Sequence, residues 1–239
     1  METINFLLGY KDLKIYQNTQ MFNFSLDSVL LPNFVTNPST AKRILDIGTG
    51  NAPIPLILST KTNAKIIGVE IQKEVYELAK KSVELNKLND QIEIINEDIN
   101  KLKDKFPSDH FDIITCNPPF FKVNNDSKFN KNDYKTISRH EVTLNLEQIC
   151  EISKKTLKNG GILDIVHRPE RLTDILHIFR KYNIEPKKIR FIHPKKNKEA
   201  NIVLVEGKKN GKSGLKILSP LISHEANGDY TKEIKKYFE

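Results

Sequence analysis

A glycine-rich turn follows the first strongly apolar run of the chain, and its residue types suit a nucleoside ligand. Asp46 lies within the run at residues 44–47, and Gly48, Gly50 and Pro53 follow it. Two glycines let the backbone turn tightly and approach a ligand closely, while proline suits the first turn of the helix that comes next. A dinucleotide fold would have a third glycine where Pro53 stands, so the spacing counts against nicotinamide binding.

Two acids follow the next two apolar runs, at the points where buried strands would end. Glu70 can accept both hydrogen bonds of a ribose diol, and Asp98 can accept from the exocyclic amine of adenine. Each acid alone is more often a turn or cap residue, but acids at the ends of successive strands together predict an adenosine-containing ligand. The full predicted cofactor-binding set is Asp46, Gly48, Gly50, Glu70, Ile71, Asp98, Ile99 and Asn117.

A second motif, Asn117-Pro118-Pro119-Phe120, follows the apolar run at 111–116 and has the residue types of a reacting centre. Two prolines fix the backbone and leave the carbonyl of Pro118 as an acceptor, and the Asn117 side chain is a second acceptor. An amine conjugated to an aromatic ring, such as adenine N6, is a poor nucleophile. Two acceptors on its hydrogens favour the pyramidal geometry that attack needs, and Phe120 offers a face to a flipped base. An Asn-Pro turn that merely ends a strand is the plain alternative.

Apolar runs and helical stretches alternate along the middle of the chain. An apolar stripe over about 72–87, through Val75, Leu78, Ala79, Ser82 and Val83, predicts the clearest helix. This alternation predicts an α/β fold with a doubly wound, mostly parallel sheet that binds ligands at the carboxyl ends of its strands. The predicted strands cover residues 44–47, 66–69, 92–95, 111–114, 162–166, 190–192 and 202–205.

The two ends of the chain are expected to be smaller additions to this sheet. Residues 1–40 form a lead-in with short extended segments near 13–17 and 21–24, then a helix over about 27–34 capped by Ser25 or Asp27. Residues 41–206 form the sheet domain, and residues 207–239 an extension packed on it. The polar stretch at 121–140 is long for a loop, so we expect a mobile lid there.

Positive charge gathers in one part of the sequence. Between Lys181 and Lys216, eleven lysine and arginine residues stand against three acids, an excess as large as the net charge of +8 of the whole chain. Such a segment suits a face that neutralises nucleic-acid phosphates, although ordinary solvated surface would give the same count. The predicted RNA-binding residues in this segment are Lys195, Lys196 and Lys198.

Length, cysteines and hydropathy exclude several other classes. A chain of 239 residues holds one large domain, its apolar runs are too short to span a membrane, and its start lacks the basic residues of a signal peptide. Cys116 and Cys150 have neither Cys-x-x-Cys nor metal-ligand spacing, so we expect reduced thiols and no metal. We therefore expect a cytoplasmic protein.

With these motifs, the chain resembles the class I S-adenosylmethionine-dependent methyltransferases that carry an Asn-Pro-Pro-aromatic motif. Within that class it is most similar to the bacterial tRNA adenine-N6 methyltransferases that modify position 37, next to the anticodon, in a valine tRNA. The similarity covers nearly the whole chain, including residues 22–31, Asp46 to Pro55, Asn117 to Phe120, Arg139-His140-Glu141 and His193-Pro194. It implies a Rossmann-like fold, S-adenosylmethionine as cofactor and the anticodon arm of tRNA as partner.

The same resemblance implies roles for individual residues. The backbone near Gly48 would hold the methionine part of the cofactor, Glu70 its ribose and Asp98 its adenine. Lys122 and Arg139, in the polar stretch at 121–140, complete the expected RNA-binding residues. The expected catalytic residues are Asn117, Pro118, Pro119 and Phe120, and the tail at 207–239 resembles an extension of Gram-positive-type relatives.

Three other functions stay open on the sequence. A protein-glutamine N5 methyltransferase of release factors also needs two acceptors for a delocalised nitrogen, but it typically has Tyr in place of Phe120 and a helical N-terminal domain. A guanine-N2 rRNA methyltransferase is the second alternative, and a non-catalytic RNA-binding module the third. The intact Asp46, Glu70, Asp98 and Asn117 argue against the third. We expect a monomer or a weak dimer.

Overall fold

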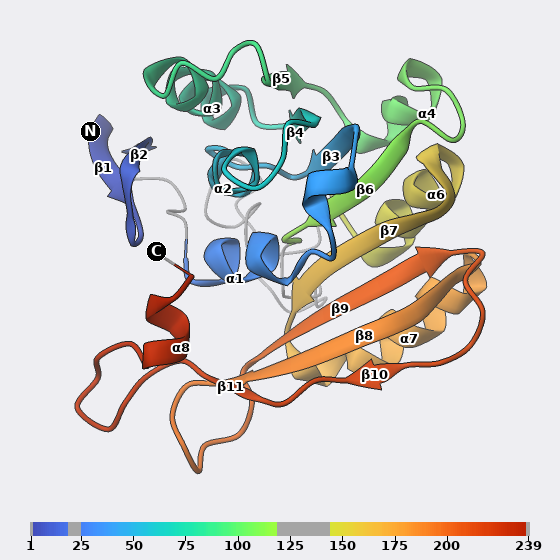
Figure 1. The fold of residues 1–239 in the computed structure, drawn as a ribbon. Helices are drawn as coiled ribbons and strands as arrows, with labels where there is room; N and C mark the ends of the chain where they lie inside the picture. Colours follow the sequence, from blue (N-terminus) through green and yellow to red (C-terminus); the bar gives the residue numbers. More distant parts are fainter. Residues whose placement is uncertain (1, 19–24, 119–143, 238–239) are drawn as a thin grey trace, which may run out of the picture.

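The protein is built around one large mixed sheet, as Figure 1 shows. The computed structural model describes residues 2–18, 25–118 and 144–237. Within them, nine strands form the sheet in the order β10-β8-β9-β7-β6-β3-β4-β5, with β11 also paired to β8. The central strands are β3 (Arg43–Ile47), β4 (Lys65–Glu70), β5 (Ile92–Asn96), β6 (Phe111–Cys116), β7 (Leu157–His167), β8 (Ile184–His193) and β9 (Ile202–Lys209).

The directions of these strands make the sheet mostly parallel. Strands β7, β6, β3, β4 and β5 pair with one another in parallel. Strand β9 lies antiparallel between β7 and β8. The predicted doubly wound, mostly parallel α/β fold is confirmed, and each predicted strand lies inside an observed one. The antiparallel direction of β9 was not predicted. A strand buried on both faces gives a continuous apolar run in the sequence, whichever direction the strand takes in the sheet.

Helices cover both faces of the sheet (Figure 1). Side chains alternate along each strand, so Ile44 and Ile66 pack in one hydrophobic core while Leu45 and Ile114 pack in the other. Short 3₁₀ turns lie at Pro38–Thr40, Ile99–Lys101 and Pro169–Arg171. The first core takes side chains from α1 (Asp27–Phe34), α2 (Pro53–Ser59) and α3 (Lys73–Leu85), and the second from α4 (Leu102–Lys105), α6 (Leu146–Thr156) and α7 (Leu172–Lys181).

The predicted helices are present, with one correction to their ends. Helix α3 buries Leu78, Ala79, Ser82 and Val83 of its predicted stripe, while Val75 stays partly exposed. Helix α1 has the predicted bounds, but its N-cap is Leu26 and no side chain caps it. The expected cap by Ser25 or Asp27 is therefore wrong. The Ser25 hydroxyl donates instead to the Asp27 carboxylate at 2.9 Å.

The lead-in forms a hairpin of β1 (Glu2–Leu7) and β2 (Tyr10–Asn18), which packs on α3. The backbone N–H of Lys14 donates to the Asn86 side chain at 3.0 Å, and that of Tyr16 donates to the Ser82 hydroxyl at 3.0 Å. The extended segment predicted near 13–17 is thus part of β2. The segment predicted near 21–24 and the lid expected over 121–140 lie outside the described residues.

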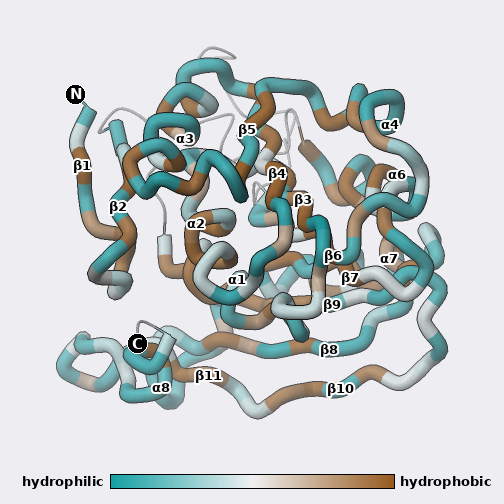
Figure 2. The backbone as a smooth tube through the Cα atoms, turned by 45° about the horizontal axis from the view of Figure 1, so that its top comes forward, coloured by the Kyte–Doolittle hydropathy of each residue, from teal (hydrophilic) through white to brown (hydrophobic). Residues whose placement is uncertain are grey.

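After β9 the chain returns along the edge of the sheet, as Figure 2 shows. Strands β10 (Lys216–Ile217) and β11 (Leu221–Ile222) pair with β8, and α8 (Lys232–Lys235) follows them. The division of the chain at 40/41 and 206/207 stays a prediction, and β9 itself runs across the second of these points. Among the described helices, none combines the length and the apolar character that a membrane span requires.

Candidate active site

The predicted site residues converge on one edge of the sheet because parallel neighbours end there together. In the register of the strands, Ile47 of β3 pairs with both Val69 of β4 and Cys116 of β6. The residues that follow, among them Gly48 and Asn117, therefore lie side by side at the carboxyl edge. Ligands of doubly wound sheets bind at such an edge.

The glycine turn after β3 is shaped to receive a ligand. Gly48 and Gly50 have φ of +66° and +59°, which side chains rarely allow. A Cβ on Gly48 would also lie 3.2 Å from Cδ2 of Leu144, whereas a Cβ on Gly50 would have no atom within 4 Å. Helix α2 then begins with Pro53. The turn thus leaves open space over Gly50.

Glu70 holds the glycine turn and remains able to accept from a ligand. Its carboxylate accepts from the backbone N–H of Gly50 at 3.0 Å and from that of Gln72 at 2.9 Å. Burial raises the pKa of Glu70, and these backbone donors oppose the rise. Each carboxylate oxygen has a further lone pair. A buried acid with that capacity beside an open turn fits the ribose diol of a nucleoside cofactor.

Asp46 precedes the glycine turn by two residues and is buried within β3. The hydroxyl of Thr115 donates to its Oδ1 at 2.6 Å. Burial raises the pKa of Asp46 to about 7, the hydrogen bond from Thr115 opposes the rise, and the nearby Glu70 adds to it. Asp46 is therefore a buried acid that changes charge near neutral pH.

The remaining predicted cofactor contacts lie at the ends of β4 and β5. Asp98 caps a short turn, since its Oδ1 accepts from the backbone and side-chain nitrogens of Asn100, both at 2.8 Å. Ile71, directly after Glu70, is 40 % exposed although it is large and apolar, while Ile99 is buried. An exposed isoleucine beside the acid that would bind the ribose offers apolar surface to an adenine ring. The set thus fits an adenosine-containing cofactor.

Asn117 stands directly after β6, and Pro118 behind it is buried. The Asn117 amide nitrogen donates to the hydroxyl of Ser28 on α1 at 3.4 Å. This contact leaves the amide oxygen as the acceptor for a substrate amine. The other two expected catalytic residues, Pro119 and Phe120, lie outside the described residues.

Two residues of the site were missed by the sequence analysis. One is Ser28, which contacts Asn117 from the buried face of α1. The other is Asn51, whose amide donates to the carbonyl of Tyr16 at 2.7 Å and so ties the glycine turn to the N-terminal hairpin. Both contacts join segments far apart in the sequence. The one available signal was a polar Ser28 directly before the apolar run Val29-Leu30-Leu31 of α1.

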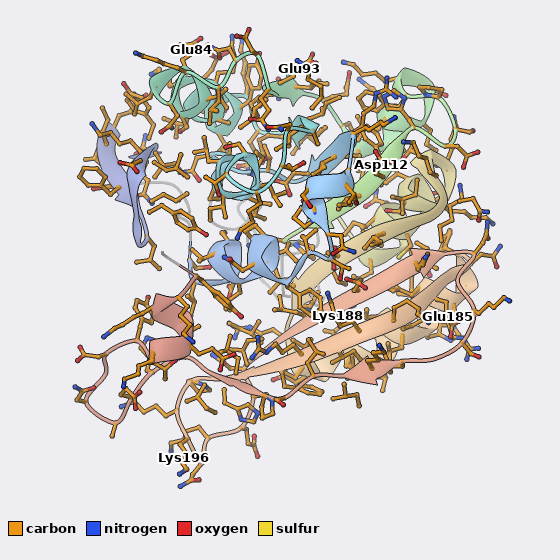
Figure 3. The ribbon with its side chains drawn as sticks, viewed as in Figure 1. Glu84, Glu93, Asp112, Glu185, Lys188 and Lys196 are labelled. Carbon is orange, nitrogen blue, oxygen red and sulfur yellow. The ribbon has the colours of Figure 1, made fainter. Side chains whose placement is uncertain are left out.

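Part of the basic segment is paired with acids in the fold, and its role in binding RNA stays a prediction. Four of its eleven basic residues form ion pairs with acids, of which only Glu206 belongs to the segment itself: Lys181, Lys188, Arg190 and Lys209. Alternate residues of β8 and β9 point to opposite faces, so their charges separate. Lys195, Lys196 and Lys198 lie together and exposed on the loop between β8 and β9, and Figure 3 shows Lys196 projecting from it. Lys122 and Arg139 lie outside the described residues.

Thiol and metal chemistry have little support at this site. Cys116 and Cys150 are free and buried, and burial raises the pKa of both thiols. Reactive cysteines instead have a lowered pKa and partial exposure. Across the described residues, no three side chains of His, Cys, Asp or Glu are grouped to hold a metal ion.

The fold and the site match a known family. Residues 38–209 match the methyltransferase domain family, and the chain belongs to that family. Two similar proteins are named tRNA1(Val) (adenine(37)-N6)-methyltransferase. The one from Porphyromonas gingivalis is 28% identical over 95% of this chain and 91% of its own length. The one from Flavobacterium psychrophilum is 25% identical over 85% of this chain and 87% of its own.

A solved structure supports the same fold. A predicted O-methyltransferase from Agrobacterium tumefaciens superposes with a TM-score of 0.70 at 22% identity, over 89% of this chain and 95% of its own. Similarity at that identity reports the arrangement of strands and helices and not the substrate. The methyltransferase family expected from the motifs is therefore confirmed.

Proposed function

We propose that this protein is a tRNA adenine-N6 methyltransferase. It transfers a methyl group from S-adenosylmethionine to N6 of the adenosine at position 37 of a valine tRNA, in the cytoplasm where tRNA is found. One observation carries the proposal: Asn117, an acceptor for the target amine, follows β6 beside the glycine turn of β3. Two relatives that match most of the chain carry this activity in their names.

The cofactor would lie along the carboxyl edge. Its methionine part would contact the backbone at Gly48, its ribose would donate to Glu70, and its adenine would lie against Ile71 with its amine near Asp98. The bound cofactor supplies a methyl group that its positively charged sulfur makes electrophilic. Glu70 has a second task in this arrangement, because it also holds the N–H of Gly50 and so fixes the turn.

The chain's own contribution to transfer is to orient the target amine. The Asn117 amide oxygen and the Pro118 carbonyl would accept the two N6 hydrogens, which draws the nitrogen lone pair out of conjugation with the ring. No strong base is needed, because the methylated amine is acidic enough to lose its proton afterwards. Catalysis of this kind depends on acceptors held in place before the substrate arrives.

The test is methyl transfer from radiolabelled S-adenosylmethionine to unmodified total tRNA, followed by nucleoside analysis and sequencing of the labelled tRNA. N6-methyladenosine at position 37 of a valine tRNA is the expected product. In parallel reactions that offer rRNA or a release factor instead of tRNA, label in N2-methylguanine of the rRNA or in glutamine of the release factor would replace the proposal with one of the other methyltransferases. A failure to bind S-adenosylmethionine in calorimetry would point to a non-catalytic module.

A further inference from the structure

The C-terminal segment, residues 216–237, lies against the loop that carries the predicted RNA-binding lysines. This β8–β9 loop comprises residues 194–201. Strands β10 and β11 of the segment add to the edge of the sheet at β8, and Leu221 and Ile234 are fully buried. The segment is therefore fixed to the body of the protein, and it is able to hold the β8–β9 loop in place.

Direct hydrogen bonds connect the segment to the start of the loop. The backbone N–H of Ser223 donates to the carbonyl of His193 at 2.8 Å, and the Ser223 hydroxyl donates to that of Pro194 at 3.2 Å. The ammonium of Lys195 donates to the carbonyl of Ala226 at 3.0 Å. The first residues of the loop are thus attached to the segment by both backbone and side chains.

Arg190 of β8 attaches the segment at three further points. Its guanidinium donates to the carbonyl of Ser219 at 3.1 Å and to the hydroxyl of Tyr237 at 2.8 Å, and it pairs with the carboxylate of Glu233. These contacts span nearly the whole segment. A single half-buried arginine on β8 therefore holds both ends of the segment.

The β8–β9 loop lies at the carboxyl edge of the sheet, and it carries lysines that are not in ion pairs with the described acids. Strand β8 is parallel to β7, because β9 runs antiparallel to both, so the loop after β8 is at the same edge as Asn117. Lys196 and Lys198 are exposed, and neither forms an ion pair with any described acid. Their side chains are available to phosphates beside the site.

We infer that the C-terminal segment orders the β8–β9 loop in advance for binding the RNA phosphate backbone. Three lysines within four positions repel one another, and an unattached loop would lose conformational entropy each time it bound. A loop already held by Ser223 and Ala226 avoids most of that loss, so it binds more tightly. The inference rests on the proposed function, since the ligand is tRNA.

The inference gives Lys195 a task different from that of its neighbours. Its ammonium is already directed to the Ala226 carbonyl, so it anchors the loop, while Lys196 and Lys198 contact phosphate. Replacing Lys196 and Lys198 together by glutamine should flatten the log–log salt dependence of tRNA affinity by about 1.5 units. Lys212, just before the segment, and Lys216, at its start in β10, are exposed and lie away from the loop, so they provide a control of equal charge.

The decisive experiment is a double-mutant cycle on tRNA affinity in the full chain. Leu221→Ala changes no charge but loosens the segment, and we expect roughly 10-fold weaker tRNA binding with a flatter salt dependence. When Leu221→Ala is added to the double variant Lys196→Gln/Lys198→Gln, tRNA binding should weaken by no more than about 2-fold relative to that double variant. The effects of coupled residues are not additive. Cofactor affinity should stay at the wild-type value throughout.

Ser223→Ala keeps the test decisive if Leu221→Ala does not fold, and about 3-fold weaker tRNA binding is expected from the lost hydroxyl. Additive effects in the cycle, or wild-type tRNA affinity in both segment variants, would overturn the inference. Either result could occur while wild-type protein still makes N6-methyladenosine in tRNA, so the proposed function would stand. Absence of that product in wild type would remove the function instead.

Discussion

At the scale of single residues, Asn117 depends on a helix that precedes the glycine turn in the chain. Its amide nitrogen points to the hydroxyl of Ser28, which is buried on α1. An asparagine side chain can rotate so that its nitrogen and oxygen exchange places. In the observed orientation the nitrogen contacts Ser28, so the oxygen is the acceptor left for a substrate. Ser28 is therefore a positioning residue in the proposed reaction.

Replacing Asn117 by alanine should lower the single-turnover rate of methyl transfer by about 10²–10³-fold, as for other preorganised polar groups. Affinities for cofactor and tRNA should hardly change, because the side chain acts on the target amine. Ser28→Ala should slow transfer by about 10-fold, whereas Ser28→Thr keeps the hydroxyl and should stay near wild type. An Asn117→Ala variant with more than about a tenth of the wild-type rate would place the reacting centre elsewhere.

Asp46 should make cofactor binding depend on pH. Burial raises the pKa of Asp46 to about 7 in the free protein, so this acid gains a proton as pH falls through the neutral range. S-adenosylmethionine has a net positive charge, which favours the charged carboxylate and lowers this pKa on binding. Affinity should therefore fall as pH drops below 7, by up to about 10-fold per unit. Calorimetry at pH 6, 7 and 8 measures this directly.

Asp46→Asn is the control for that pH dependence. The variant cannot titrate at this position, and it reports any titration of the cofactor itself. The difference in affinity between wild type and variant should be largest above pH 8, where Asp46 is charged, and should shrink toward pH 6, where wild-type Asp46 is neutral like asparagine. Parallel pH profiles for the two proteins would contradict the role given to Asp46.

At the scale of elements, one polar row crosses the hydrophobic sheet. Asp46, Thr115, Asp164, Glu206 and Lys188 stand opposite one another on β3, β6, β7, β9 and β8. Lys188 pairs with Glu206 at 2.7 Å, and Figure 3 shows Lys188 on β8. Neither carboxyl oxygen of Asp164 has a hydrogen-bond partner among the described residues. Burial raises the pKa of Asp164, and the Glu206 charge raises it further against the opposing effect of Lys188.

Asp164→Asn should therefore stabilise the protein more at high pH than at low pH. The folded protein holds the Asp164 proton more tightly than the unfolded chain, so this acid lowers the free energy of unfolding as pH rises above about 4. Asparagine keeps the shape without the titration. The gain should be small near pH 4 and larger at pH 8, with a slope of at most about 1.4 kcal/mol per pH unit. Urea unfolding at both pH values decides it, and an equal gain at both would refute it.

The sequence was sufficient to predict the strands and helices that have a local apolar pattern. It was insufficient for elements that depend on contacts between residues far apart in the chain. The strands from β3 to β9 and helix α3 were predicted because their apolar patterns are short-range. The hairpin partner β1 was not, since Ile4 and Phe6 are exposed and its pairing needs β2. In the site, Glu70 and Asn117 follow recognisable strands, whereas the contacts of Ser28 and Asn51 join α1 and β2 to distant turns.

At the scale of the whole molecule, the two ends of the chain come to the edge that binds the ligands. Figure 1 shows the N-terminal hairpin and α8 toward the same side of the sheet. The hairpin contacts the glycine turn through Asn51 and Tyr16, and α1 contacts the reacting centre through Ser28. We therefore expect occupancy of the cofactor site to be coupled to segments that the cofactor does not touch.

Saturating S-adenosylmethionine should raise the melting temperature by about 5–10 °C. A ligand at 100 times its Kd adds about 2.7 kcal/mol to the free energy of unfolding, and each kcal/mol shifts a chain of this size by about 2–4 °C. Glu70→Ala should lose most of the shift, because it removes the ribose acceptor and releases the N–H of Gly50. Hydrogen exchange should also slow in Tyr10–Asn18 and Asp27–Phe34, since Asn51 ties β2 to the glycine turn and Ser28 ties α1 to Asn117 at the same edge. The edge strand β10 serves as the internal control, with no change expected. If the melting temperature rises but protection is confined to residues 48–52, the hairpin and α1 do not sense the cofactor and the coupling is absent.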